Sequence, residues 1–300
     1  MNFVIDFIKG CVIGIANIVP GVSGGTLALM LGVYNKMLGA ISGILKQFKK
    51  SVKVLLPILL GCAFGIIAFS FIITYLIGNH PFPTSMSFIG LIFGGLPMLF
   101  LCFKKAEKET AEKKKSSRGA RMVLNILLFL FFLVGSILLS ISKTADEGTT
   151  HDITFLTMFI FFLMGMVASA AMIIPGISGS LIMMILGYYF EIVGAVKDFV
   201  HALKDFDVDK MFSLFKILIP FGIGVVLGIF LVAKIIKWLL EKHPAPTYAS
   251  ILGLIVASPV SIFLKVEFFE GSLGVVPIII GCVLFVVFFV VSLKFSKAEE

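Results

Sequence analysis

One stretch of this 300-residue chain occurs twice, and the duplication restricts the possible folds more than any other feature. The first copy, from Ala16, reads ANIVPGVSGGTLALMLGVY, and the second, from Ala171, reads AMIIPGISGSLIMMILGYY. Each residue of the second copy lies 155 positions after its counterpart (16 to 171). Because similarity at a constant offset indicates an internal repeat, the chain is predicted to consist of two related halves, residues 1–142 and residues 143–300.

The composition places both halves in a membrane. Hydrophobic residues make up 59% of the chain and charged residues 14%, whereas soluble domains contain about 45–50% apolar and about 25% charged residues. The net charge of +8 is attributed to cytoplasmic loops that face anionic lipid, and no nucleic-acid partner is expected. Ten apolar segments divide five and five between the halves: 3–19, 24–45, 54–77, 84–103, 121–142, 153–174, 179–197, 214–240, 247–264 and 274–293.

The apolar runs that follow each Pro-Gly-x-Ser-Gly break are shorter than a membrane span. About ten residues separate Gly25 from Asn35, and a similar run separates Ser180 from Glu191, whereas a spanning helix needs about 20 apolar residues. We therefore predict an all-α polytopic membrane protein with an inverted repeat of five helical segments each. Every repeat would hold a re-entrant helical hairpin and three transmembrane helices, with the hairpin tip shielded from lipid. The alternative is two full spans joined by an ordinary loop at each break.

The distribution of charge predicts the orientation. If both termini lie in the cytoplasm, the basic residues of the loop 104–121 face the cytoplasm and the acidic stretch 198–210 faces outside, as the positive-inside rule requires. An odd number of crossings per half then inverts the second half. The expected location is the bacterial cytoplasmic membrane, with several passes and with no removable signal peptide at the N-terminus.

The repeated break is the first candidate for a functional site. Pro ends a helix, Gly allows a close approach of the backbone, and Ser can cap the next helix. The free N–H groups at such a helix start favour an anion, and two tips that meet near the midplane would suit one phosphate or carboxylate. The alternative is a purely structural role, in which each break is a kink where two hairpins pack. The predicted substrate-binding residues are Pro20, Gly21, Ser23, Gly24, Gly25, Thr26, Pro175, Gly176, Ser178, Gly179 and Ser180.

Charged residues inside apolar segments are the second candidate. Lys36 and Glu191 occupy equivalent repeat positions, and Asp6 lies in the first segment. Buried charge is costly and usually functional, so these three residues are predicted to act in gating or coupling, with Lys36 and Glu191 as a pair. The bland interpretation is that the charged groups reach the membrane interface from the hairpin ends.

Other repeated motifs are predicted to be structural. The His-Pro-x-Pro-Thr turns would cap helices that start at Thr84 and Thr247. Two Gly-x-x-x-Gly pairs, one from Gly61 and one from Gly224, indicate close helix packing. The sequence lacks a metal-ligand cluster, so no metal, no other cofactor and no catalytic residue are expected.

The two copies of the break resemble the bacterial PopT family of polyprenyl-phosphate translocases. The similarity extends over essentially the whole chain, and PGVSGGTLALMLGVY and PGISGSLIMMILGYY carry it. The resemblance implies a flippase that returns undecaprenyl phosphate, the carrier lipid of cell-wall synthesis, across the membrane by alternating access. It also implies a polyprenyl-phosphate lipid as the partner within the bilayer. The sequence leaves the oligomeric state open, and a homo-oligomer is compatible with it.

Two further functions stay open at this point. The tips are also similar to the Pro-Gly-x-Ser-Arg-Ser loops of undecaprenyl pyrophosphate phosphatases, but Gly179 stands where those enzymes have Arg. The Glu-rich partner motif of those enzymes is absent as well, which argues against hydrolysis. The third function is transport of a small organic anion.

Overall fold

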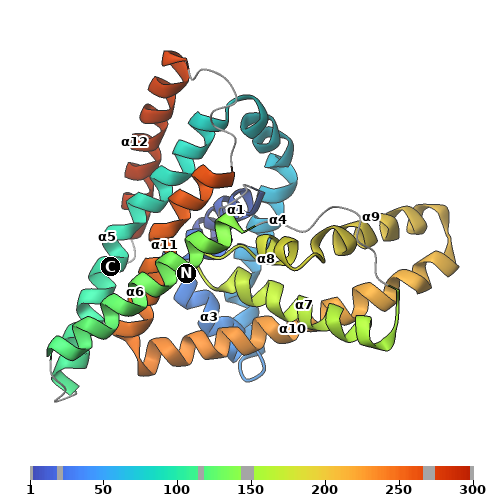
Figure 1. The fold of residues 1–300 in the computed structure, drawn as a ribbon, viewed down its shortest axis with the longest axis horizontal. Coiled ribbons are helices and arrows are strands. Elements are labelled where there is room, and N and C mark those ends of the chain that lie inside the picture. Colours follow the sequence, from blue (N-terminus) through green and yellow to red (C-terminus); the bar gives the residue numbers. More distant parts are fainter. Residues whose placement is uncertain (1–2, 19–22, 114–117, 143–151, 266–273, 298–300) are drawn as a thin grey trace. The chain divides into compact units, whose positions relative to one another are not determined.

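The computed structural model describes residues 3–18, 23–113, 118–142, 152–265 and 274–297, and the following statements concern these residues. They form helices and no strands (Figure 1). The helices are α1 (Phe3–Ile18), α2 (Gly24–Met30), α3 (Tyr34–Gly43), α4 (Phe48–Asn79), α5 (Pro81–Lys113), α6 (Arg118–Ile141), α7 (Phe155–Ile173), α8 (Gly179–Ile185), α9 (Tyr189–Asp205), α10 (Val208–Lys242), α11 (Pro244–Lys265) and α12 (Val275–Lys297).

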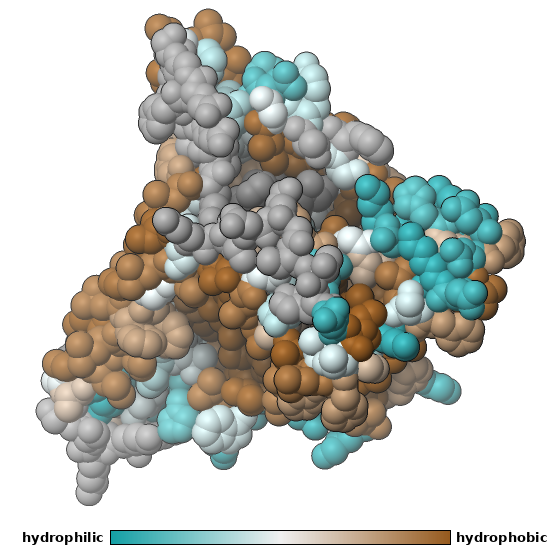
Figure 2. Space-filling model, turned by 45° about the vertical axis from the view of Figure 1, so that its right-hand side comes forward, coloured by the Kyte–Doolittle hydropathy of each residue, from teal (hydrophilic) through white to brown (hydrophobic). Residues whose placement is uncertain are grey.

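Seven of the described helices are long and apolar enough to cross a bilayer, namely α4, α5, α6, α7, α10, α11 and α12. Large apolar side chains are exposed along all seven. Figure 2 shows one face, on which apolar side chains cover much of the surface and hydrophilic side chains gather in separate groups. Such a surface is stable in lipid and not in water, so the prediction of an all-α polytopic membrane protein is confirmed.

A second break follows each tip, and the sequence analysis did not predict it. Helices α2 and α8 have only seven residues each, and they end before Gly32 (φ 75°) and Gly187 (φ 83°). The N–H of Val33 bonds to the carbonyl of Ala28 at 3.0 Å, and the N–H of Gly32 to that of Leu29, also at 3.0 Å. This pair of bonds around a left-handed glycine is the Schellman motif, and equivalent bonds surround Gly187. The apolar segments 24–45 and 179–197 are therefore two helices each.

The described chain divides into two compact units. Unit 1 comprises Met1–Ile141, Ile174–Ile177 and Ala233–Glu300, and unit 2 comprises Ser142–Ile173 and Ser178–Val232. These units do not follow the predicted halves, because the last two helices of the second half belong to unit 1. The division into two repeats remains a statement about the sequence, and the inversion of one repeat remains a prediction.

In unit 1, helices α1 and α4 pack with their backbones in contact. A Cβ on Gly61 would collide with the carbonyl oxygen of Phe7, and one on Gly65 with that of Cys11. In the other direction, a Cβ on Gly10 would meet the carbonyl of Ile58. The predicted role of the Gly-x-x-x-Gly pair in close helix packing is confirmed.

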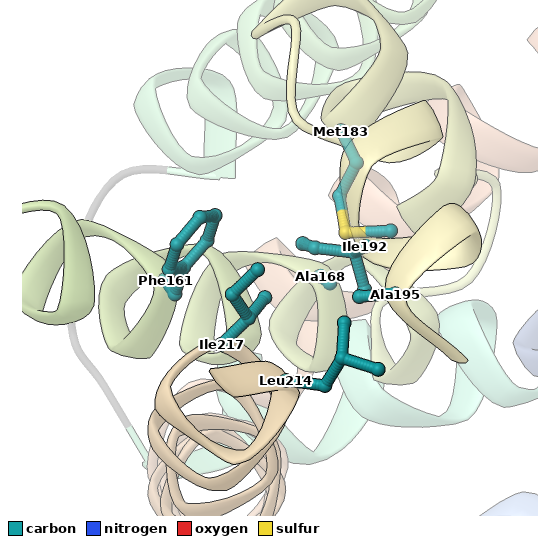
Figure 3. Packing of buried hydrophobic residues seen from close by; sticks show 7 residues of the cluster. All are labelled: Phe161, Ala168, Met183, Ile192, Ala195, Leu214 and Ile217. Carbon is teal, nitrogen blue, oxygen red and sulfur yellow. The ribbon is translucent and has the colours of Figure 1, made fainter. Parts of the chain in front are cut away.

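Unit 2 repeats this packing between α7 and α10. A Cβ on Gly224 would collide with the carbonyl oxygen of Phe162, and one on Gly165 with that of Phe221. Each of these residues is the repeat counterpart of one in the α1–α4 contact. The core of unit 2 lies beside this contact, where side chains from α7, α8, α9 and α10 point toward one another (Figure 3): Phe161, Ala168, Met183, Ile192, Ala195, Leu214 and Ile217.

The last two helices of each half exchange partners within unit 1. Helix α5 packs along α12, and α11 packs along α6 (Figure 1). Glycines again allow the approach, since a Cβ on Gly90 would meet the carbonyl of Phe285 and one on Gly253 that of Phe129. The fifth helix of each half therefore packs against the sixth helix of the other half, which ties the C-terminal helices to unit 1.

Two local predictions need correction. The helices α5 and α11 start at Pro81 and Pro244, not at the threonines, because proline suits the first helical position. The hydroxyls of Thr84 and Thr247 instead donate to the carbonyls of the preceding histidines at 2.7 Å. The stretch 104–121 is predicted as a partly helical charged loop, and more of it is helix than expected, since α5 runs to Lys113 and α6 begins at Arg118.

Candidate functional site

The first tip is buried in unit 1. Pro20 and Gly21 lie outside the described residues, so the tip begins with Ser23, whose extended backbone precedes α2. Six of the seven α2 residues are buried, and the helix packs against α1 and α5. Gly95 of α5 makes room for Met30, because a Cβ there would collide with the Met30 side chain. This packing fixes the position of the tip.

Ser23 has an unusual environment. Its side chain is only 6% exposed, and its Oγ has no hydrogen-bond partner among the described residues. The predicted capping bond to the start of α2 is absent, so this prediction was wrong for Ser23. A buried hydroxyl without a partner loses its bond to water and costs roughly 1–3 kcal/mol. Such a group is a candidate for binding a ligand.

Thr26 connects the first tip to the second break. Its side chain is fully buried, and its Oγ1 accepts a hydrogen bond of 2.7 Å from the N–H of Gly176. Gly176 has φ +84°, and a Cβ there would lie 2.6 Å from the Leu254 side chain and carbonyl oxygen. Only glycine fits this position without strain. The two Pro-Gly-x-Ser-Gly stretches therefore meet at the Thr26–Gly176 bond.

Two further residues surround this contact. Pro175 is fully buried, and Ser136 of α6 donates its hydroxyl to the carbonyl of Gly176 at 3.4 Å. The sequence analysis missed Ser136, which stands out as a serine within an apolar segment. It also missed Asn17, whose side-chain oxygen and nitrogen would clash with a Cβ on Gly24. The sequence signal for Asn17 is a difference between the two copies of the repeat, because the polar Asn17 corresponds to the apolar Met172.

The second tip continues in unit 2 with a different pattern. Ser178 caps α8 as predicted, because its Oγ accepts from the N–H of Leu181 at 3.4 Å. Its hydroxyl also lies 3.0 Å from that of the exposed Ser180. Gly179 is buried, and a Cβ there would approach the carbonyl of Ala168 to 2.6 Å. The matched serines thus differ, since Ser178 is bonded and Ser23 has no partner within the described part of the chain.

The buried charges form an ion pair that the sequence analysis did not predict. The Lys36 ammonium lies 2.6 Å and 2.9 Å from the two Asp6 carboxylate oxygens, and it joins α3 to α1. The Asp6 side chain is 5% exposed and that of Lys36 30% exposed. Lys9, one turn further along α1, is also buried. Glu191 lies in the first turn of α9 in unit 2, and its predicted pairing with Lys36 stays a prediction.

The described residues contain no group of three or more His, Cys, Asp or Glu side chains that could hold a metal ion. The first tip presents the Ser23 hydroxyl and the backbone N–H groups at the start of α2, and the second tip presents the hydroxyls of Ser178 and Ser180. This set of groups can hold an anion by hydrogen bonds.

Comparison with known proteins identifies the family. The family model described as VCA0040-like, undecaprenyl phosphate translocase-like, matches residues 13–272. The chain belongs to this family. The match includes both tips and the α7–α10 contact.

Two curated relatives agree with this family. The chain is 31% identical to a polyprenyl-phosphate transporter of Staphylococcus aureus over 296 residues, which cover 98% of this chain and 96% of the relative. It is 29% identical over 272 residues to a polyprenyl-phosphate transporter of Vibrio cholerae, with coverage of 86% and 77%. The names of the family and of both relatives denote transport proteins, not enzymes. No solved structure matches the chain.

Proposed function

We propose that this protein is a polyprenyl-phosphate transporter that moves undecaprenyl phosphate across the bacterial cytoplasmic membrane. Its family and the names of its two relatives support a prenyl-phosphate substrate. The observation that carries the site is the Thr26–Gly176 hydrogen bond, which brings the two Pro-Gly-x-Ser-Gly stretches together. We assign the phosphate headgroup to this junction.

The chemistry of the tips suits a phosphate. The Ser23 hydroxyl needs a partner, and the first N–H groups of α2, at Gly24 and Gly25, have no acceptor within the helix. Ser178 and Ser180 add two hydroxyls on the other tip. Because α2 and α8 have only two turns, their dipoles are small, and binding depends on these individual donors. Pro175 and Gly179 shape the second turn. Pro20 and Gly21, which lie outside the described residues, stay predicted substrate-binding residues.

A transporter of this lipid must shield only its headgroup. A charge at the bilayer centre costs several kcal/mol or more, whereas an isoprenoid chain is stable in the hydrocarbon. The tips would shield the phosphate at membrane depth as re-entrant hairpins, while the chain stays among the helices. Alternating access between the two repeats would then carry the headgroup across. Carrier-lipid recycling in cell-wall synthesis is the role that fits this substrate.

We assign gating or coupling to Asp6, Lys36 and Glu191. The Asp6–Lys36 pair is neutral as a whole and joins α1 to α3, the second helix after the first tip. Separating a buried ion pair leaves two charges without compensation, so partly separated arrangements are unfavourable. The pair therefore favours either a closed or a fully open arrangement and can act as a two-state element. Glu191 occupies the position of Lys36 in the second repeat and would take the equivalent role there.

The test is a transport assay with the full chain in liposomes that contain undecaprenyl phosphate, with and without a pH gradient. We expect the protein to move the lipid phosphate between leaflets faster than empty liposomes do. Two further measurements use the same preparation. Steady release of inorganic phosphate from undecaprenyl pyrophosphate would indicate a phosphatase, and flux of a soluble anion without lipid translocation would indicate an anion transporter. Either result would overturn the proposal.

A further inference from the structure

Three helices of unit 1 enclose an apolar cavity that none of the tip residues lines. The cavity has a volume of about 620 Å³, within the range of ligand sites. Helices α5, α6 and α11 supply its walls, and all three are candidate membrane spans. The lining residues are Phe93, Leu96, Pro97, Phe100, Phe103, Met122, Asn125, Ile126, Phe129, Ala249, Leu252 and Val256.

The cavity is open along part of its wall. Several lining side chains keep a third to a half of their surface exposed, among them Phe93, Phe100, Met122, Ile126 and Val256. Because these residues lie within candidate membrane spans, their exposed surface faces the interior of the bilayer. An occupant must therefore come from the lipid phase and must be apolar over most of its length.

Polar groups gather at one end of the cavity. Asn125 is the one polar lining residue, and its amide donates to Glu107 at 3.0 Å. The other Glu107 oxygen lies 3.4 Å from Nε of Arg121, so this carboxylate is neutralised by its pair. The Lys104 ammonium lies 4.7 Å from the centre of the Phe100 ring, which is a cavity wall. This end is therefore cationic, while the rest of the wall is hydrocarbon.

We infer that this cavity binds the isoprenoid chain of a prenyl phosphate, with the phosphate toward Lys104. The inference rests on the proposed function and adds a second substrate site, distinct from the tips. Aromatic and branched side chains line the walls and suit a chain with methyl branches. The cationic end selects an anionic headgroup over a neutral one. Holding the chain here would gather the substrate before its headgroup reaches the tips.

The test measures binding of geranylgeranyl phosphate to the purified full chain in detergent. Val256→Trp fills the cavity, and Val260→Trp places the same side chain one turn further along α11 at a residue outside the cavity. Val256 is 37% and Val260 39% exposed, so we expect the fold to tolerate both substitutions to a similar degree. Ile126→Trp and Leu127→Trp form a second matched pair on α6. We expect the two cavity variants to bind about tenfold more weakly and the two controls to bind normally.

The headgroup is tested by competition. Unlabelled geranylgeranyl phosphate should displace the probe, geranylgeraniol should do so at least about tenfold less well, and Lys104→Gln should remove this difference. Equal binding by each tryptophan variant and its control would overturn the inference. So would equal displacement by phosphatidylglycerol, which would show a groove for membrane lipids in general. Both results would leave transport through the tips untouched, because no cavity residue belongs to them.

Discussion

At the scale of single residues, the two matched tips differ in how their polar groups are satisfied. Ser178 bonds to the start of α8, whereas the buried hydroxyl of Ser23 has no partner in the described part of the chain. The sequence pattern assigns both serines the same role, because propensity describes the local backbone and not the packing around it. The asymmetry arises from the burial of the first tip in unit 1.

Thr26→Val tests the junction of the two tips. Valine has a similar shape but cannot accept the hydrogen bond from the Gly176 N–H. We expect a loss of about 1–3 kcal/mol in the free energy of unfolding, because a buried N–H is left without a partner. Thr26→Ser keeps the hydroxyl and serves as the control. Thermal unfolding in detergent gives the comparison, and equal stability of the valine variant and the wild type would contradict the predicted role of the bond.

Gly176→Ala tests the backbone at the second break. A side chain at φ +84° is strained, and the Cβ would collide with Leu254, so we expect a cost of about 2 kcal/mol or more. Gly39→Ala is the control, since a Cβ at Gly39 in α3 would meet nothing within 4 Å. Alanine there should stabilise the helix by about 0.5–1 kcal/mol. Unfolding midpoints that shift in the same direction for both variants would argue against this account.

At the scale of elements, the sequence predicts helix existence and helix packing better than helix breaks. Apolar runs indicate the long helices, and Gly-x-x-x-Gly pairs indicate that a helix packs closely against another, since both depend on residue type alone. The breaks at Gly32 and Gly187 escape such a reading, because the apolar pattern continues across them. What distinguishes these glycines is a positive φ, which depends on how the following helix is held by its neighbours.

The ion pair between α1 and α3 provides a prediction at this scale. Asp6→Asn or Lys36→Gln alone should cost about 1–3 kcal/mol of stability, because each leaves a partly buried charge without its partner. The double variant should regain a large part of this loss. A double-mutant cycle measured by unfolding in detergent isolates the coupling between the two side chains. Strictly additive losses would mean that the pair contributes nothing as a pair.

At the scale of the whole molecule, the sequence predicts two halves, whereas the contacts in the structure divide the chain into two compact units with other boundaries. The partner exchange of α5 with α12 and of α11 with α6 draws the last helices into unit 1. Repeat similarity cannot reveal this exchange, because equivalent glycines such as Gly90 and Gly253 mark a close contact without naming the partner. The sequence predicts that the two tips meet, but it does not predict that Thr26 and Gly176 form the hydrogen bond between them.

The predicted orientation is tested by cysteine labelling in a variant without native cysteines. Lys108→Cys and Lys210→Cys introduce thiols at exposed positions in the basic stretch of α5 and in the acidic first turn of α10. If the positive-inside rule sets the topology, a membrane-impermeant reagent added to whole cells labels Cys at position 210 and leaves position 108 unlabelled. Labelling of position 108 alone would mean the opposite orientation, and labelling of both positions would contradict their placement on opposite sides of the membrane.

The most direct test of the central claim compares the translocation of undecaprenyl phosphate by Ser23→Ala and Ser85→Ala in liposomes. Both serines are buried, and neither hydroxyl has a hydrogen-bond partner among the residues that the structure describes, but Ser85 lies in α5 outside the tips. If Ser23 holds the headgroup, its alanine variant should translocate the lipid about tenfold more slowly than the wild type. Ser85→Ala should retain the wild-type rate. Equal rates for the two variants would contradict the assignment of the headgroup to the tips.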